Sequence, residues 1–471
     1  MAVACGSGFT ATVTEQGDVW AFENGRSGVL LGLGTNACQV LPGCVGGANV
    51  FDGKAVVMVA AGRKHTACVV SDGTLWSWGK GDYGRLGNGD SKPRQRPERV
   101  PKEMFGGSPA VMVTCGNTHS LVLTIEGRVW SCGWGHLGRL GHGDNADKLV
   151  LTLVTAEGFR GAPDDELIIM VAAGGDHSVA LGAQGRVWTW GWGGRGQLGH
   201  NDYECRRVPT PLDEVDFLGT AVLISAGAFH TVAVTSTGAL WAWGHGGYGQ
   251  LGLGDIANRL VPVWVGAEEA FEGSVVITAA CGEYHTLSVT KGGALYSCGQ
   301  GSHGALGHSD QNNRLVPTRV KAQHFGNTNI VSIAAGQSHS AAVTEDGGLY
   351  TWGDDRMVPT PIATHLLQGA RVGCCNRLSP HHALAFAMGT HSRLGSAAPT
   401  AAAAGGQRSL QRHAGKAPAA AGEGKDCGYV TMPGDLVQRV VEACMSWGRA
   451  GELDGVVRLL NGGMMKERRS T

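Results

Sequence analysis

The stretch Gly73–Asp90, GTLWSWGKGDYGRLGNGD, decides the fold of this chain because four further copies of it follow. Each copy is a short apolar segment that ends in Trp-Gly or Cys-Gly, then a glycine-rich loop, then Leu-Gly and a closing Asp. The further copies are Gly127–Asp144, Gly185–Asp202, Gly238–Asp255 and Gly293–Asp310. Self-similarity of this kind indicates a repeat architecture, which has to be recognised before any single motif is given a function.

A second phrase precedes each copy: an apolar run, a small residue, Gly, two variable residues, His, and Thr or Ser, as in VMVAAGRKHTACVV. The phrase occurs seven times, and its glycines are Gly6, Gly62, Gly116, Gly174, Gly227, Gly282 and Gly336. Six copies keep the histidine, and these are His65, His119, His177, His230, His285 and His339. The first copy has Phe9 in its place. The period of about 55 residues indicates one supersecondary unit per repeat.

Each unit is expected to form four β-strands. The runs VMVAA and HTACVV are apolar and rich in β-branched residues, and Gly62 separates them. Asp72-Gly73 suits the positive φ of a tight hairpin, and Thr74–Trp78 follows as the third strand. The fourth strand, such as VPTPL at Val208, contains prolines that cannot donate to a ladder, so it belongs at a sheet edge. Seven such units predict an all-β, seven-bladed β-propeller of four-stranded antiparallel blades, with an open solenoid as the alternative.

The two ends of the chain are less regular. The seventh unit runs from Trp352-Gly353 straight into DDRMVPTPI without the glycine-rich loop. A degenerate half repeat at 370–389 is expected to meet Ala2–Trp20 and help seal the ring, so that the propeller spans 1–390. Residues 391–428 are rich in Ala and Gly, which predicts a disordered linker. Residues 429–471 predict a short helical tail that packs on the propeller or binds a partner.

Composition excludes several classes of protein. The net charge of -1 gives no global field that would draw the chain to nucleic acid or membrane. The chain contains no apolar run of about 18 residues, and its N-terminus does not resemble a signal peptide, so a cytoplasmic or nuclear protein is expected. Several of the 13 cysteines replace Ala or Trp of other copies, as Cys132 replaces Trp78. They are therefore expected to be buried apolar residues rather than disulfides or zinc ligands.

Two motifs suggest chemistry when they are considered singly. The loops such as GKGDYG at 79–84 match G-x-G-x-x-G, but no helix is expected to follow, and a dinucleotide site needs a helix N-terminus. No cofactor is therefore predicted. The six histidines are distributed one per unit, whereas metal ligands must converge on one ion. They are predicted to be structural, with a ring nitrogen bonded to backbone inside the blade, and no catalytic or metal-binding residue is assigned.

The paired phrases A-A-G-x-x-H-[TS] and G-x-[LV]-[WY]-x-[WC]-G-x-G-x-x-G-x-L-G resemble the regulator of chromosome condensation repeat over residues 1–390. The resemblance implies a seven-bladed propeller. Members of that family include exchange factors for the small GTPase Ran that bind chromatin, ubiquitin-ligase modules, ciliary scaffolds and plant ultraviolet-B receptors. The family fold therefore leaves the function open. The receptors carry Trp-Arg in several of the doublets before the histidine, and this chain carries none, which disfavours photoreception.

The residues that the repeat leaves variable are the candidate partner-binding residues, because corresponding loops of all units lie on one face. They occupy the doublets before the histidines and the glycine-rich loops. The candidates are Arg63, Lys64, Asp176, Phe229, Glu283, Tyr284, Lys80, Tyr83, Arg195 and Tyr248.

The sequence favours a non-catalytic protein-interaction scaffold that binds a protein partner through this face. The alternative is a guanine-nucleotide exchange factor for a Ran-like small GTPase. In the exchange factors an acidic residue directly before the histidine contributes to exchange, and only Asp176 has that position here. The exchange factors also insert a β-wedge, and this chain has only a modest acidic extension, Glu157–Glu166, where that wedge would be expected. The basic segment Lys92–Lys102 offers chromatin contact as a further alternative.

Overall fold

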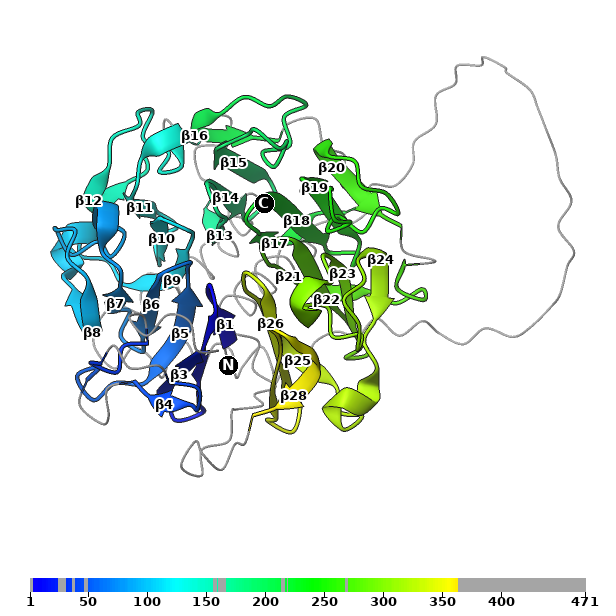
Figure 1. The fold of residues 1–471 in the computed structure, drawn as a ribbon. Coiled ribbons are helices and arrows are strands. Elements are labelled where there is room, and N and C mark those ends of the chain that lie inside the picture. Colours follow the sequence, from blue (N-terminus) through cyan, green and yellow to red (C-terminus); the bar gives the residue numbers. More distant parts are fainter. Residues whose placement is uncertain are drawn as a thin grey trace, which may run out of the picture. The chain divides into compact units, whose positions relative to one another are not determined.

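The structure is a computed structural model, and it describes residues 3–23, 31–35, 39–45, 50–155, 159, 167–212, 217, 219–266 and 270–362. Within these residues the strands form seven four-stranded antiparallel sheets, and each sheet is built from one continuous segment of chain. The sheets follow one another around a ring in sequence order (Figure 1). The predicted seven-bladed β-propeller is confirmed. The predicted half repeat at 370–389, the linker and the helical tail lie outside the described residues and stay predictions.

The strand bounds, blade by blade, show the regularity of the repeat. Blades one to three contain β1 (Val3–Cys5), β2 (Phe9–Val13), β3 (Val19–Glu23), β4 (Gly43–Cys44), β5 (Val56–Ala61), β6 (His65–Val70), β7 (Leu75–Gly79), β8 (Arg94–Val100), β9 (Ala110–Cys115), β10 (His119–Thr124), β11 (Val129–Gly133) and β12 (Lys148–Leu153). Blades four and five contain β13 (Ile168–Ala173), β14 (His177–Gly182), β15 (Val187–Gly191), β16 (Arg206–Pro211), β17 (Ala221–Ala226), β18 (His230–Thr235), β19 (Leu240–Gly244) and β20 (Arg259–Val265). Blades six and seven contain β21 (Val276–Cys281), β22 (His285–Thr290), β23 (Leu295–Gly299), β24 (Arg314–Arg319), β25 (Ile330–Ala335), β26 (His339–Thr344), β27 (Leu349–Gly353) and β28 (Arg356–Pro361).

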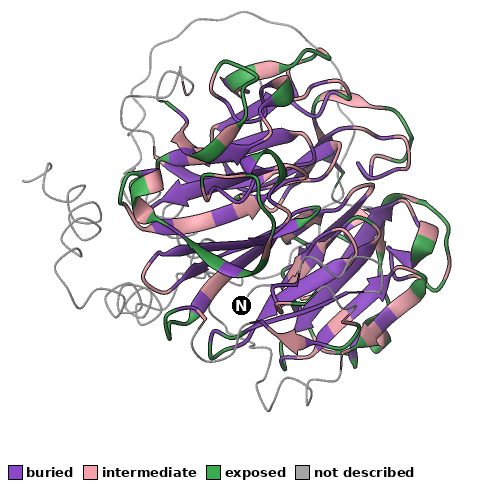
Figure 2. Ribbon diagram, turned by 60° about the vertical axis from the view of Figure 1, so that its left-hand side comes forward, coloured by how far each residue is buried: buried purple, intermediate pink, exposed green. Residues whose placement is uncertain are grey.

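Burial follows the order of strands within a blade. The first strand of each blade lines a central cavity. The second strand is buried along its whole length in every blade. Figure 2 shows that the strands of the ring are largely buried, in purple. The fourth strand is the outer edge and is partly exposed, as in β16, where Pro209 and Pro211 lie. This placement is the one expected of a strand whose prolines cannot donate to a ladder.

Aromatic residues of the third strand fill the space between blades. Trp78, Trp190, Trp243 and Trp352 are at most 1% exposed. The glycine of the Leu-Gly pair makes room for the third-strand side chain of the next blade, which is a tryptophan in most cases: a Cβ added to Gly199 would lie 3.0 Å from Nε1 of Trp243. Gly87 faces Cys132 in the same way, so the Trp-to-Cys exchange occurs at one buried position. Burial of such large side chains is the main apolar contribution to blade association.

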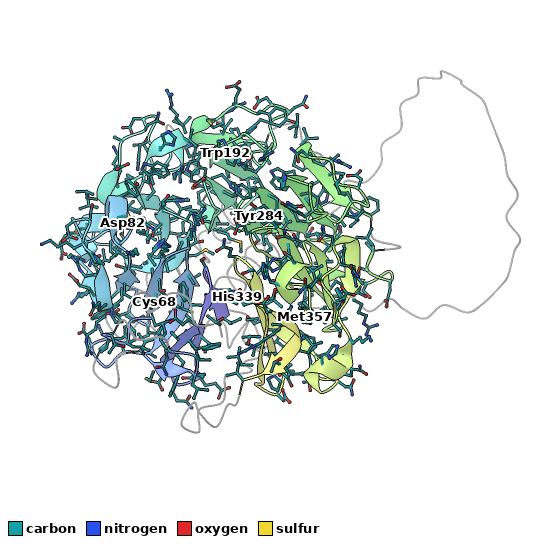
Figure 3. The ribbon with its side chains drawn as sticks, in the orientation of Figure 1. Cys68, Asp82, Trp192, Tyr284, His339 and Met357 are labelled. Atoms are coloured by element: carbon teal, nitrogen blue, oxygen red, sulfur yellow. The ribbon has the colours of Figure 1, made fainter. Side chains whose placement is uncertain are left out.

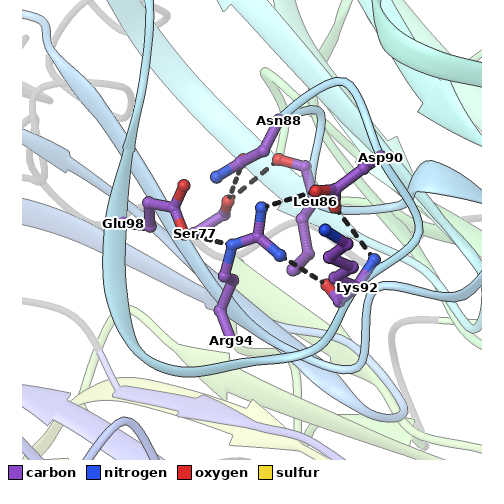
Figure 4. A network of polar contacts seen from close by, with 7 residues as sticks. All are labelled: Ser77, Leu86, Asn88, Asp90, Lys92, Arg94 and Glu98. Carbon is purple, nitrogen blue, oxygen red and sulfur yellow. Dashed lines mark hydrogen bonds and ion pairs between the residues drawn. The ribbon is translucent and has the colours of Figure 1, made fainter.

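A repeated polar network shapes the glycine-rich loop (Figure 4). In blade two the Ser77 hydroxyl contacts the Leu86 carbonyl oxygen at 2.9 Å and Oδ1 of Asn88 at 3.0 Å, and Arg94 pairs with Asp90 at 3.0 Å. Equivalent hydroxyl-to-carbonyl bonds occur at Ser131, Thr189 and Ser297. The closing Asp of the repeated phrase therefore anchors the start of the fourth strand.

The helices whose bounds lie within the described residues are short 3₁₀ helices, which are η1 (Asp82–Gly84), η2 (Lys102–Phe105), η3 (His136–Gly138), η5 (Ser302–Gly304) and η6 (Ala322–Phe325). Three of them lie inside G-x-G-x-x-G loops and have three residues each. Such a turn has no helix N-terminus that could hold a pyrophosphate, and the glycines serve the geometry of the loop.

The ring closes where the first blade meets the seventh. β1 packs against β25 and β26, and the backbone N–H of Gln337 donates to the Gly6 carbonyl oxygen at 3.3 Å. In the seventh blade the missing loop is replaced by a tight turn in which Asp354 and Asp355 both have positive φ, 48° and 76°. This is the backbone geometry of a two-residue hairpin, so the blade still has its fourth strand. Contact of residues 370–389 with the first blade lies outside the described residues.

Candidate functional site

The doublets and the glycine-rich loops lie on one face of the propeller, which we call the loop face. It comprises the turns between the first and second strands and between the third and fourth strands of each blade. The two sets of turns are joined by backbone hydrogen bonds, for example from Lys80 N–H to Lys64 O at 2.8 Å and from His245 N–H to Phe229 O at 2.9 Å. The predicted candidates therefore share one face, and the hairpins such as Ile125–Arg128 lie on the opposite face.

The six histidines form bonds between blades, which corrects the expectation of a backbone partner inside the blade. Each Nε2 lies 2.8–3.1 Å from the hydroxyl that follows the histidine position in the next blade. The pairs are His65–Ser120, His119–Ser178, His177–Thr231, His230–Thr286, His285–Ser340 and, across the ring closure, His339–Thr10. Sequence reasoning missed the partner because it lies about 55 residues away, although the conserved Thr or Ser of the phrase carried the signal.

Five of these hydroxyls also donate to a loop carbonyl of the preceding blade, as Thr231 does to Gln197 O at 2.9 Å. Because that bond uses the hydroxyl proton, the histidine Nε2 has to be the donor in the other bond. Burial lowers the pKa of His65, His177, His230 and His285 to about 3. These rings are therefore neutral, fully buried hydrogen-bond donors and are unsuited to proton transfer near neutral pH.

The chain of histidine bonds is interrupted at one junction. Phe9 replaces the histidine in the first blade, and Thr66 Oγ1 in the second blade is buried without a hydrogen-bond partner. An unpaired buried hydroxyl costs about 1–3 kcal/mol. The junction between blades one and two is therefore predicted to gain less from hydrogen bonding than the junctions that carry a histidine.

The seven phrase glycines form a ring around the central cavity, which has a volume of about 320 Å³. A Cβ added to any of them would lie 2.4–2.6 Å from the carbonyl oxygen of the corresponding glycine in the next blade. The next residue often donates its N–H to the neighbouring blade, as Arg63 does to Gly116 O at 3.1 Å and Glu283 to Gly336 O at 3.1 Å. The first residues of the doublets therefore surround the mouth of this cavity.

Asp176 is engaged inside the protein. Its carboxylate pairs with the guanidinium of Arg139, whose side chain is 0% exposed. Arg139 also donates to Thr118 Oγ1 at 2.8 Å and lies 4.5 Å from the ring centroid of Trp134. Asp176 thus neutralises a buried cation, and its side chain remains 27% exposed. Truncating it would leave the charge of Arg139 unpaired, which is costly in a buried site.

Four of the predicted candidates meet in one pocket. Arg195, Phe229, Tyr248 and Tyr284 line a cavity of about 160 Å³ together with Trp192 and His245, which sequence reasoning missed. Both missed residues directly follow the Trp-Gly of their blades, so their shared position in the repeat was an available signal. Of these residues, Trp192 lies nearer the outer edge of the ring in Figure 3 and Tyr284 nearer its centre.

The rings of this pocket form a connected cluster. Phe229 lies 5.8 Å from Trp192 and 5.4 Å from Tyr284, measured between ring centroids. Tyr284 lies 4.9 Å from Tyr248, with the ring planes at 66°. These separations and angles are in the favourable range for aromatic pairs.

Tyr83 lies in a second aromatic group, near the blade-two loop. Its ring stacks on Trp134 at 5.2 Å, and Trp134 stacks on His136 at 4.9 Å. Tyr83 is 42% exposed and has a φ of 63°, which is uncommon for a residue other than glycine. The structure therefore divides the predicted aromatic candidates between two neighbouring groups.

The basic candidates lack carboxylate partners. Among the described residues no ion pair within 4 Å involves Arg63, Lys64, Lys80 or Arg195. Burial raises the pKa of Glu283, and hydrogen bonding to Gln337 and the charge of Arg63 oppose that rise. The loop face thus combines unpaired cations with aromatic rings, which is the composition enriched in protein interfaces.

Two features are absent from the described part of the chain. No cluster of three or more His, Cys, Asp or Glu side chains there has the arrangement of a metal site. No helix there is long and apolar enough to span a bilayer.

Comparison with known proteins identifies relatives of this chain. A model of the RCC1-like domain matches residues 159–410, and a model of the regulator of chromosome condensation (RCC1) repeat matches 72–123 and 126–181. The ultraviolet-B receptor UVR8 of Arabidopsis thaliana is 38% identical over 316 residues, which are 66% of this chain and 68% of the receptor. The E3 ubiquitin-protein ligase HERC2 of Homo sapiens is 31% identical over 346 residues, which are 72% of this chain but 7% of HERC2.

Among solved structures, that of Prp20p from Saccharomyces cerevisiae, described together with its binding to Gsp1p and histones, is similar with a TM-score of 0.63 and 25% identity. The similarity covers 75% of this chain and 87% of Prp20p. The matched models cover residues in both halves of the propeller, and the model of the RCC1-like domain alone spans more than half of the chain. The chain therefore belongs to the regulator of chromosome condensation (RCC1) repeat family.

Proposed function

We propose that this protein is a non-catalytic interaction scaffold that binds a partner protein through the loop face. The observation that carries the proposal is the combination of a connected aromatic cluster with four cations, Arg63, Lys64, Lys80 and Arg195, that form no ion pair within 4 Å among the described residues. Such groups are enriched where proteins meet.

The chemistry of the buried residues supports a role without catalysis. The phrase histidines are neutral and occupied by bonds between blades, so they are poor general acids or bases. Burial raises the pKa of Cys5, Cys115, Cys281 and Cys298 to about 12, which makes them poor nucleophiles. The eight described cysteines are all free thiols, which supports a reducing compartment, and we propose the cytoplasm or nucleus.

The proposal is tested by proximity labelling in cells with three forms of the full chain. These are the wild type, the loop-face variant Arg63→Glu/Lys64→Glu, and the opposite-face control Arg128→Glu, whose side chain is 61% exposed. We expect the loop-face variant to lose a set of partners that the wild type and the control retain. Identical partner sets for all three forms would contradict binding through the loop face.

The second candidate is guanine-nucleotide exchange on a Ran-like small GTPase, supported by the similarity to Prp20p, whose structure was described with its binding to Gsp1p. Release of a fluorescent GDP analogue from a panel of small GTPases tests it. Asp176→Ala is a poor probe of this activity because Asp176 balances the buried Arg139. Arg63→Glu/Lys64→Glu changes only exposed side chains, so acceleration by the wild type that this variant loses would favour exchange over scaffolding.

A further inference from the structure

We propose that the pocket lined by Trp192, Arg195, Phe229, His245, Tyr248 and Tyr284 receives one large apolar side chain from an acidic peptide segment of the partner. The inference rests on the proposed function and names the chemistry of the partner. Three features of the pocket support it: its size, its charge and its rigidity.

The size of the pocket fits one side chain better than a whole ligand. Its volume is about 160 Å³, whereas sites for small molecules usually measure about 300–1,000 Å³. Five of the six lining residues carry aromatic rings. Trp192 meets Phe229 at 78° and Tyr248 meets Tyr284 at 66°, while Phe229 and Tyr284 are tilted by 30°. An inserted aromatic ring would continue this edge-to-face arrangement, and an anchor of this kind in a well-packed pocket is typical of an interface hot spot.

The charge of the pocket favours acidic flanking residues. Arg195 is exposed, has no ion-pair partner among the described residues, and no carboxylate lines the cavity. Burial and the charge of Arg195 both lower the pKa of His245, so that ring is neutral at physiological pH. The carboxylate of Glu283 is hydrogen-bonded to Gln337 and to the hydroxyl of Tyr284, and the charge of Arg63 acts on it as well. Among the residues that line the cavity, Arg195 is the one that carries a charge. A positive rim attracts an acidic segment and disfavours a methylated ammonium group, the other usual guest of aromatic cages.

The pocket is held rigid from below by two buried glutamines. Gln250, which is 0% exposed, donates from Nε2 to Nδ1 of His245 at 2.7 Å and accepts from Tyr248 N–H at 2.9 Å. Gln197, also 0% exposed, accepts from Arg195 N–H at 2.8 Å. The loops of blades four and five are thus fixed before binding, and a preformed pocket loses less entropy when it is filled.

The test is fluorescence polarisation with the full chain and four short fluorescein-labelled peptides. The first has acidic residues around a central phenylalanine, the second replaces the phenylalanine by alanine, the third has basic flanks around phenylalanine, and the fourth places trimethyllysine in the acidic frame. We expect the first peptide to bind at least about tenfold more tightly than each of the others.

Two matched pairs of variants locate the binding. Arg195→Glu should weaken the first peptide about tenfold, and Arg128→Glu on the opposite face should not. Tyr248→Ala should weaken it similarly, while Tyr203→Ala, whose side chain is 54% exposed outside the pocket, should not. Equal binding of the phenylalanine and alanine peptides, preference for trimethyllysine, or binding that Arg195→Glu leaves unchanged would each overturn the inference. If any of these outcomes were observed while Arg63→Glu/Lys64→Glu still removed cellular partners, the proposed function of the loop face would be supported and the proposed role of the pocket would be wrong.

Discussion

The interrupted chain of histidine bonds makes a quantitative prediction about two threonines at the same position of the repeat. Thr231 accepts from His177 Nε2 at 2.9 Å and donates to Gln197 O at 2.9 Å, and Thr66 Oγ1 has no partner. Both residues are at most 1% exposed. Replacement by valine keeps the shape and removes only the hydroxyl, so the two variants differ in the hydrogen bonds that are lost.

The expected magnitudes have opposite signs. Thr231→Val leaves the buried His177 Nε2–H and the Gln197 carbonyl without this partner, at about 1–3 kcal/mol for each unsatisfied group, so the free energy of unfolding should fall by about 2–6 kcal/mol. Thr66→Val removes a hydroxyl that is already unsatisfied, and the free energy of unfolding should stay constant or rise by about 1 kcal/mol.

The assay is urea unfolding at neutral pH, followed by tryptophan fluorescence, with the midpoint compared at unchanged slope. A double-mutant cycle extends it: Phe9→His should interact favourably with Thr66 and lose that interaction when Thr66 is valine, with a coupling of about 1 kcal/mol. If Thr66→Val lowered stability as much as Thr231→Val, the bonds between blades would not be the source of the difference, and the reasoning would be refuted.

Three further predictions concern stability. Acid titration followed by circular dichroism should show full stability above pH 6.5 and a steep loss of stability toward lower pH. The reason is that His65, His177, His230 and His285 have pKa values of about 3 in the folded protein, so the unfolded chain binds protons first, which costs up to about 1.4 kcal/mol per histidine and pH unit. A flat stability profile down to pH 4 would contradict this prediction. Gly174→Ala should lower the unfolding midpoint strongly, since its Cβ would lie 2.3 Å from His177 Cε1, whereas Gly292→Ala meets no atom within 4 Å and should be neutral; equal midpoints would argue against the glycine ring. Asp176→Asn should cost about 1–3 kcal/mol by leaving Arg139 unpaired, and Asp355→Asn at an exposed position serves as its control in the same unfolding assay.

The propeller itself could be predicted from the sequence because its signals are local and repeated. Local structure is predicted by the Asp72-Gly73 turn, by the apolar runs around Gly62 and by the prolines of the fourth strand. The constant period then shows that the same unit occurs seven times. The bounds differ only slightly, with Leu75–Gly79 observed where Thr74–Trp78 was predicted. The predicted linker at 391–428 and tail at 429–471 remain predictions.

The candidate site could be predicted only in part. The variable positions of the repeat identified Arg195, Phe229, Tyr248 and Tyr284, but the pocket also needs Trp192 and His245, which sequence reasoning did not single out. The signal that would have found them is their shared position after Trp-Gly. That these six residues surround one cavity, and that Tyr83 does not belong to it, depends on how neighbouring blades are packed side by side.

The repeated stretch Gly73–Asp90 and the histidine phrase that precedes it thus determined by themselves the strand pattern, the blade number and the face on which the variable residues lie, because hydrogen bonds and turns within one unit depend on neighbouring residues. Only the tertiary structure decided what joins one unit to the next. In the folded protein each phrase histidine is hydrogen-bonded to a hydroxyl of the following blade, and Asp176 forms an ion pair with the buried Arg139. The aromatic pocket is formed by residues of three blades. The physical reason is that contacts between blades join residues about 55 positions apart, and the side-chain geometry that selects these partners exists only once the ring has closed.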